Sequence, residues 1–257
     1  MSASPLVDVF SWTCDWARAS GYKLWANDET SSTNAIAKDD TETATRPVLL
    51  TPSSFSGPSV YLAKRQSAGR GRGTHTWTTP DGSALLSSWS FAVKTVPQPI
   101  FSALVGLALF EACTQIWPEV GFNIKAPNDL YIDDKKVAGI LIETVDQGHE
   151  KRTVIGVGLN ASGSPENVPT ATDLSEHLKR ASGRDLERSE WVRFLETWVR
   201  ELTTAVAAGL ESRLQPTAAA RLCRALNLHP LLKEPILQVD EFGQLHSATR
   251  VIHWHEL

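Results

Sequence analysis

The sequence predicts an α+β domain built on a mixed, largely antiparallel sheet, with helices packed on one side and a small β appendage at the C-terminus. Three observations support this prediction. Short apolar or alternating runs recur between turn residues, these runs follow one another without strict strand-helix alternation, and two long helical patterns stand apart from them. With 257 residues and 42% hydrophobic content, the chain can bury one large core.

The first half of the chain is predicted to contain a helix start, several strands and a glycine-rich loop. Residues 22–25 are short and extended, and the N-cap residues at 29–34 lead into a helix. Apolar runs bounded by Pro, Ser and Gly predict strands at 47–51, 59–64 and 83–93. Residues 66–73 contain too much glycine for either element, so we expect a long, mobile loop there.

The second half is predicted to hold two helices and an antiparallel meander. Pro97 and Pro99 open a long apolar helix that ends before Pro118. Polar turns separate the expected strands of the meander, at 123–125, 130–132, 137–145 and 152–159. Apolar residues at helical spacing predict a helix over 191–206, and the residues after 235 predict the β appendage. We therefore divide the chain into a main domain, 1–212, and a small C-terminal region, 213–257.

Composition excludes several classes of protein. The formal net charge of -4 gives no basic field of the kind that drives binding to nucleic acid, which disfavours DNA as a partner. Cys14, Cys113 and Cys223 stand far apart and are odd in number, which predicts reduced thiols in a cytoplasmic protein. The first residues lack the features of a signal peptide. Polar residues interrupt the apolar stretch 100–117, so we expect a buried helix and no membrane span.

A glycine-rich loop is the first motif that carries chemistry. Gly69-Arg70-Gly71-Arg72-Gly73 combines flexible glycines with two permanent cations, and Trp77 follows four residues later. Glycines let backbone N–H groups approach an anion, and guanidinium groups bind carboxylate or phosphate oxygens as a fork. Taken alone, the loop fits a solvated basic turn or a nucleic-acid-binding segment equally well. It lacks the spacing of a Walker A loop.

Two further motifs follow. In Lys125-Ala126-Pro127-Asn128-Asp129 a strand meets a proline turn, which predicts Asn128 and Asp129 at a hairpin root, and Lys136 begins the returning strand. A lysine beside an acid can stabilise charge on a phosphoryl group, although such pairs are more often surface ion pairs. Gly156-Val157-Gly158-Leu159-Asn160 ends an apolar strand, and alone it indicates close packing followed by a turn.

Taken together and in this order, these motifs resemble the biotin protein ligase family. The matching stretches are GRGRGTHTW at 69–77, KAPND at 125–129, KVAGIL at 136–141 and GVGLN at 156–160. Ser32-Thr33-Asn34 and Gln66 also fall where the family has S-T-N and Q. Two positions depart from the family pattern: Ala126 replaces a tryptophan, and His75 stands where many bacterial members have arginine.

The resemblance implies the biotin/lipoate ligase catalytic fold, similar to class II synthetases, for residues 1–212. The C-terminal region, 213–257, matches the family's SH3-like domain only vaguely. Repressor-type members carry an N-terminal winged helix-turn-helix domain, whereas only about twenty residues precede the first expected strand here, which suggests a monofunctional enzyme without direct DNA binding.

The activity implied is the formation of biotinyl-5′-AMP from biotin and ATP, with Mg²⁺ accompanying the triphosphate, and transfer of biotin to a lysine of a biotin carboxyl carrier protein, as in acetyl-CoA carboxylase. A homodimer is left open, and no metal ligand is assigned. Two alternatives remain. One is a lipoate or octanoate ligase or transferase of the same fold. The other is a non-catalytic biotin-binding regulator, which would need Ser32, Thr33 and Gln66 but not Lys136 and Asp129.

The resemblance also implies roles for individual residues. The group expected to act in catalysis is Lys136, Asp129, Arg70 and Arg72. The group expected to bind biotin is Ser32, Thr33, Gln66, Gly69, Arg70, Arg72, Trp77, Lys136, Gly139, Gly156 and Gly158. The group expected to bind the nucleotide is Arg72, His75, Asn128, Lys136 and Asn160. Lys125 is expected to act as a structural or electrostatic support.

Overall fold

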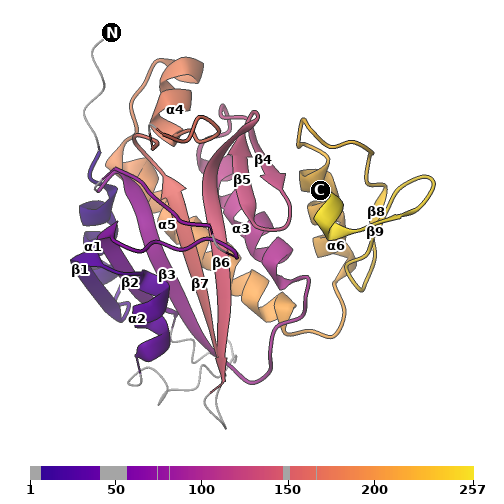
Figure 1. Cartoon of the computed structure of the whole chain (residues 1–257), viewed down its shortest axis with the longest axis horizontal. Coiled ribbons are helices and arrows are strands. Elements are labelled where there is room, and N and C mark those ends of the chain that lie inside the picture. The colour runs from indigo at the N-terminus through magenta and orange to yellow at the C-terminus, as the bar shows by residue number, and fades with distance from the viewer. Residues whose placement is uncertain (1–6, 41–56, 74, 81, 147–150, 166) are drawn as a thin grey trace. The chain divides into compact units, whose positions relative to one another are not determined.

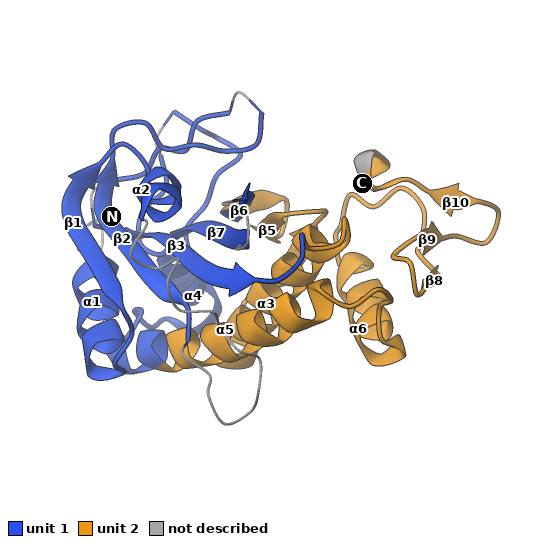
Figure 2. Cartoon of the chain, turned by 90° about the horizontal axis from the view of Figure 1, so that it is seen from below, with its two compact units in different colours: residues 1–96, 138–192 blue, residues 97–137, 193–257 orange. Residues whose placement is uncertain are grey.

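The computed structural model describes residues 7–40, 57–73, 75–80, 82–146, 151–165 and 167–257 (Figure 1). The chain divides into two compact units, each discontinuous in sequence (Figure 2). Unit 1 comprises 1–96 and 138–192, and unit 2 comprises 97–137 and 193–257. The strand expected at 47–51 lies outside the described residues. The domain boundary expected at residue 212 stays a prediction.

The sheet of unit 1 begins with a parallel pair and continues with antiparallel strands. β1 (Leu24–Thr30) and β2 (Ser59–Gln66) are parallel, whereas β3 (Ala84–Val93), β7 (Lys151–Asn160) and β6 (Lys135–Asp146) each run antiparallel to their neighbours. β6 starts in unit 2 and runs on into unit 1. With β5 (Asp129–Ile132) and β4 (Phe122–Lys125), the full strand order is β1-β2-β3-β7-β6-β5-β4. The predicted mixed, largely antiparallel sheet is therefore confirmed.

Two helices of unit 1 cover opposite faces of this sheet: α1 (Val9–Ala19) and α2 (Thr33–Asp39). The ring of Trp89 on β3 lies 6.3 Å from the ring of Trp16 on α1. Ser88 precedes Trp89 on β3, and its hydroxyl donates to the hydroxyl of Thr33 at the start of α2 (2.8 Å). Successive side chains of a strand point to opposite faces, so α1 and α2 lie on different sides. The expectation that the helices pack on one side of the sheet therefore has an exception, because α1 and α2 lie on opposite faces.

Unit 2 is built around an apolar helix, α3 (Phe101–Ile116), that is buried along most of its length. This helix and α6 (Pro216–Leu226) pack against the hairpin strand β4 (Phe122–Lys125), which pairs with β5 (Asp129–Ile132). The second part of α5 (Arg188–Gly209) adds Phe194, whose ring lies 5.2 Å from that of Trp117. No helix in the described ranges is both long and apolar enough to cross a membrane.

The C-terminal β appendage is also confirmed. β8 (Gln238–Val239), β9 (Leu245–His246) and β10 (Val251–Ile252) form an antiparallel sheet, followed by the short helix η2 (Trp254–Glu256). Three amphipathic helices were not predicted: α1, α6 and α4 (Leu174–Ser182). The aspartates Asp8 and Asp173 cap α1 and α4 by accepting a first-turn N–H, a local signal that the sequence does contain.

Candidate active site

The start of α2 is a buried polar cluster in unit 1. Ser32, Thr33 and Asn34 are each at most 5% exposed. The backbone N–H of Thr33 donates to Oε1 of Gln66 at the end of β2 (2.7 Å), and the Thr33 hydroxyl donates to the same oxygen (3.3 Å). Gln66 thereby satisfies one of the first-turn N–H groups that have no partner within the helix. Ser32 occupies the N-cap position without making a cap hydrogen bond, so its hydroxyl is not used by the helix.

The glycine-rich loop folds back on itself as a hairpin. The N–H of Gly71 donates to the carbonyl of His75 (2.7 Å), and the N–H of Trp77 donates to the carbonyl of Gly69 (2.9 Å). Arg70 and Thr76 form an antiparallel bridge between them. The expected loop is therefore present, with a more regular backbone than glycine content alone suggested.

Three glycines lie together on the sheet face that carries α2. Gly156 and Gly158 are two residues apart on β7, and Gly139 on β6 stands opposite Gly158 in the register. A Cβ atom at Gly158 would lie 2.5 Å from the indole of Trp77, and a Cβ atom at Gly156 would overlap the side-chain amide of Asn34. Only glycine allows these two side chains to approach the sheet so closely. We call this backbone surface, with Trp77 and Asn34 packed directly on β7, the glycine floor.

Glu143 is a functional candidate that sequence analysis did not identify. Its Oε2 accepts from Nη2 of Arg70 (2.8 Å) and from Nδ2 of Asn34 (2.9 Å), and its Oε1 accepts from Nζ of Lys38 (2.7 Å). Burial alone would raise the pKa of the Glu143 carboxyl. The hydrogen bonds from Lys38 and Asn34, with the charges of Arg70 and Lys38, outweigh burial and lower that pKa below its ordinary value.

A simple signal could have revealed Glu143. It lies two residues after the KVAGIL motif, on a strand that was predicted. Gly139, Leu141 and Glu143 share a face because side chains alternate along β6. Three other residues of this polar network were given no role from the sequence. Asn34 lies in the S-T-N stretch, Lys38 lies further along α2, and Ser88 lies on β3.

The remaining loop residues are exposed. Arg72 and His75 lie at the tip of the hairpin, where the N–H of His75 donates to the carbonyl of Arg72 (3.2 Å). Their expected contacts with phosphate stay predictions. Asn160, at the end of β7, is 2% exposed and donates through Nδ2 to the carbonyl of Thr172 (3.0 Å). Its Oδ1 is buried and accepts no hydrogen bond from the described residues, and the expected contact of Asn160 with the nucleotide stays a prediction.

Unit 2 carries the second part of the predicted site, on the β4–β5 hairpin and the start of β6. Asp129 begins β5 opposite Lys125, as the motif predicted. Nζ of Lys136 lies 2.8 Å from Oδ1 of Asp129, and both side chains are about a quarter to a third exposed, at 32% and 22%. The neighbouring Asn128 is 8% exposed. A lysine and a carboxylate are thus held together at a partly solvated position.

The supporting residues of this hairpin have ordinary structural roles. The Lys125 ammonium lies 5.4 Å from the centre of the Tyr131 ring, and its expected supporting role stays a prediction. Ala126, the departure from the family's tryptophan, is half-buried and precedes a cis peptide bond to Pro127.

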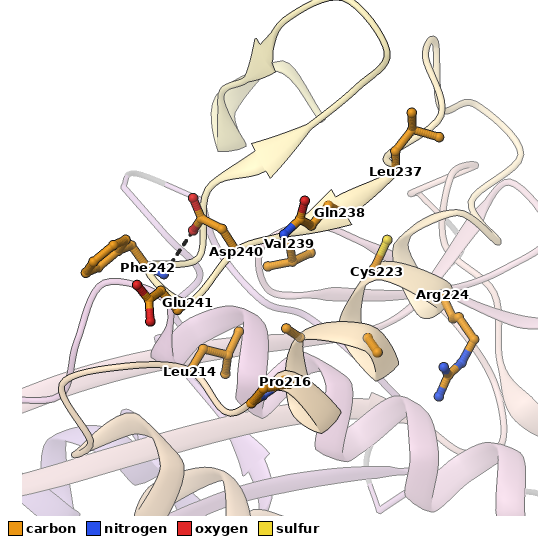
Figure 3. Close-up of a pocket in the computed structure, with 12 residues that line it drawn as sticks. Leu214, Pro216, Cys223, Arg224, Leu237, Gln238, Val239, Asp240, Glu241 and Phe242 are labelled. Carbon is orange, nitrogen blue, oxygen red and sulfur yellow. Dashed lines mark hydrogen bonds between the residues drawn. The ribbon is translucent and has the colours of Figure 1, made fainter.

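A groove of about 720 Å³ lies elsewhere in unit 2, between α6 and the segment that leads through β8 into the following turn (Figure 3). Leu214, Pro216 and Val239 contribute apolar surface to it, and the N–H of Phe242 donates to Asp240 at its edge (2.9 Å). None of the predicted site residues lines this groove. We therefore do not place the reaction there.

The structure has the fold of biotin protein ligases. A solved biotin protein ligase from Aquifex aeolicus, in complex with biotin and ATP, matches with a TM-score of 0.64 and covers 90% of this chain and 95% of that one. The sequences are 22% identical, so this likeness concerns the fold alone.

Sequence comparison shows which family part of the chain resembles. The sequence model of the biotin/lipoate A/B protein ligase family matches residues 39–160. The bifunctional ligase/repressor BirA of Escherichia coli (strain K12) is 35% identical over 194 residues, which are 74% of this chain and 58% of that protein. A biotin--[acetyl-CoA-carboxylase] ligase of Mycobacterium tuberculosis is 31% identical over 163 residues, 60% of each chain. The chain therefore spans less than two thirds of the length of these relatives. In its matched part, the chain is similar in sequence to the biotin/lipoate A/B protein ligase family.

Proposed function

We propose that this protein is a biotin ligase, which activates biotin with ATP and transfers it to a lysine of a biotin carboxyl carrier protein. One observation carries the proposal: a single face of unit 1 holds a buried polar cluster, the glycine floor, an aromatic ring and a guanidinium. Biotin has a polar ureido ring, an apolar body and a terminal carboxylate, and each needs a matching surface once it is buried.

Each part of the ligand has a candidate partner. Ser32, Thr33 and Gln66 would hydrogen-bond the ureido edge, and Trp77 would cover the apolar body. Arg70 would bind the carboxylate as a fork. Gly139 would let the ligand approach the backbone, because it presents no side chain to it. Gly69, Gly156 and Gly158 would act indirectly, by letting Trp77 and Asn34 lie close to the loop and to β7.

In the first step, a biotin carboxylate oxygen attacks the α-phosphorus of ATP and pyrophosphate leaves, which gives the mixed anhydride biotinyl-5′-AMP. Arg72 and His75 would hold phosphate oxygens, and Asn128 and Asn160 would contact the adenylate. The Lys136 charge matters most as negative charge develops on the α-phosphoryl oxygens, so it favours the transition state over the bound substrates.

In the second step, the neutral amine of the carrier lysine attacks the acyl carbon, AMP leaves and an amide forms. The amine must lose a proton, and Asp129 is the candidate to accept it or to orient the amine. The mixed anhydride hydrolyses readily, so the glycine-rich loop has to exclude water until the carrier arrives. A carboxylase such as acetyl-CoA carboxylase would supply the carrier, and a homodimer stays a prediction.

Magnesium would enter this reaction with the nucleotide. Among the described residues, no group of three or more His, Cys, Asp and Glu side chains is placed to hold a metal ion. This donor set does not fit a metal held by the protein, so we assign Mg²⁺ to the triphosphate, and none of the steps above depends on a protein ligand to it.

The family includes lipoate ligases, so the acyl substrate needs a direct test. The measurement is the exchange of labelled pyrophosphate into ATP, run in parallel with biotin, lipoate and octanoate. Exchange that depends on biotin supports the proposal. Exchange with lipoate or octanoate but not with biotin would replace it by the first alternative. Biotin binding without exchange would indicate a non-catalytic regulator.

A further inference from the structure

The carboxylate of Glu143 connects three segments of unit 1 that are far apart in sequence. It lies on β6, and its donors come from the glycine-rich loop (Arg70), the first turn of α2 (Asn34) and the last turn of α2 (Lys38). The sequence separations are 73, 109 and 105 residues. A charged acceptor shared by three donors fixes its partners more firmly than three separate contacts would.

The three donors are not equivalent. Asn34 is buried and Lys38 is about three-quarters buried, so these two hold Glu143 in place as part of the fold. The Arg70 side chain is 43% exposed, and it reaches Glu143 from a loop of flexible glycines. One Nη2 atom contacts Glu143, and a guanidinium has five N–H donors, so Arg70 can bind a second carboxylate without leaving the first.

We propose that Glu143 is a positioning residue of the biotin site, which acts by holding the Arg70 guanidinium and the glycine-rich loop in the orientation that accepts the ligand carboxylate. The inference rests on the proposed function. A long arginine side chain on a glycine-rich loop loses much conformational freedom when it binds a ligand. Glu143 restricts that freedom in advance, which should appear as tighter binding of the acid.

The first test compares Glu143→Gln with a matched control, Asp146→Asn. The control lies on the same strand and removes an exposed ion pair to Lys151. In biotin-dependent pyrophosphate exchange, we expect Glu143→Gln to raise the KM for biotin about tenfold. Its kcat should change less than about threefold, because the lost interaction acts on the bound and the reacting acid alike. The control should keep the wild-type KM.

A double-mutant cycle tests whether Glu143 works through Arg70. In an Arg70→Ala background, Glu143→Gln should change the KM for biotin by less than about twofold, since the group that it positions is gone. An equal rise in both backgrounds would assign Glu143 a general structural role and overturn the proposal. A wild-type KM in the Glu143→Gln single variant would also overturn it. Absence of biotin-dependent exchange in the wild-type protein would instead refute the proposed function.

Hydrogen exchange of the ligand-free protein provides a readout that does not depend on activity. The N–H groups of Gly71 and Trp77 close the loop hairpin. If Glu143 holds this loop through Arg70, both amides should exchange about tenfold faster in Glu143→Gln and at the wild-type rate in Asp146→Asn. Unchanged exchange in Glu143→Gln would contradict the link between Glu143 and the loop.

Discussion

The two parts of the candidate site differ in how far along the chain their contacts reach. The Glu143 network of unit 1 joins residues 73 to 109 positions apart. Asp129 and Lys136 of unit 2 instead belong to one short hairpin, which is formed by β5 and the start of β6. The network surrounds the proposed acid-binding face, and the hairpin carries the charges proposed to act on the reacting atoms. This difference suggests that long-range packing arranges binding, while local structure supplies the catalytic charges.

The comparison predicts that variants of the two regions affect different measured quantities. Variants of the hairpin in unit 2 should change rates more than affinity, because their groups matter most when charge develops in the transition state. Variants of the Glu143 face in unit 1 should change affinity or stability more than rate.

The largest effect is expected for Lys136→Ala. The rate of adenylate formation should fall by about 10²-fold to 10³-fold, because a positive charge near the developing phosphoryl charge is lost. The affinity for biotin should change less than about threefold. Pyrophosphate exchange and calorimetric titration with biotin measure the two quantities, and Lys135→Ala, which removes the exposed neighbouring lysine, is the control. Equal losses in rate and affinity would place Lys136 in substrate binding.

The second variant, Asp129→Asn, should slow transfer from preformed biotinyl-AMP to a carrier protein by about 10²-fold, the typical contribution of a positioned general base. Biotin binding should stay close to wild type. Single-turnover transfer gives the rate, and Asp134→Asn in the exposed turn of the same hairpin is the control. A variant that loses biotin affinity but transfers supplied adenylate normally would refute this role for Asp129.

The third variant, Gly158→Ala, tests the glycine floor of unit 1. The new Cβ would lie 2.5 Å from the Trp77 indole, so the ring or the strand must move. We expect the free energy of unfolding to fall by about 1–3 kcal/mol, as in other overpacked sites. Denaturant titration measures it. At Gly121 a Cβ would meet only an atom 3.9 Å away, so Gly121→Ala should stay within about 0.5 kcal/mol of wild type. A stable Gly158→Ala would show that Trp77 adapts freely.

The sequence predicted the hairpin better than the Glu143 network for a physical reason. Lys125, Asp129 and Lys136 lie within one meander whose strands and turns have strong local signals, so their proximity follows from the register. Thr33 and Gln66 were identified only through the family resemblance, because their positions depend on contacts between distant strands. Arg70 stood out through its glycine-rich loop, but its partner did not. Glu143 belongs to no motif, and its strand alternation shows the face on which it lies but not its partners.

Similar reasoning explains the elements that were missed. The strands and α3 were predicted because apolar runs with clear boundaries mark them. The helices α1, α4 and α6 have mixed polar and apolar residues, and packing decides their conformation more than intrinsic propensity does.

The smallest expected effect, the pH dependence of stability, concerns Glu143 again. Arg70, Lys38 and Asn34 face its carboxyl, and they lower its pKa in the folded chain below the ordinary value of 4.5 in spite of burial. A lowered folded pKa contributes stability that is present above the unfolded value and is lost as the pH falls through the folded one.

The difference in free energy of unfolding between the wild-type protein and Glu143→Gln should therefore be fully developed above the ordinary glutamate pKa and shrink at lower pH. Denaturant titrations at several pH values measure this difference. Lys38→Met sharpens the test, because Lys38 donates one of the hydrogen bonds that lower the Glu143 pKa. In this variant, the stability that comes from the Glu143 charge should be lost at a higher pH than in the wild-type protein. A difference that is independent of pH would mean that Glu143 stabilises unit 1 by packing alone. In that case the charges around Glu143 would add no stability, and the contrast drawn between this face and the hairpin of unit 2 would not rest on them.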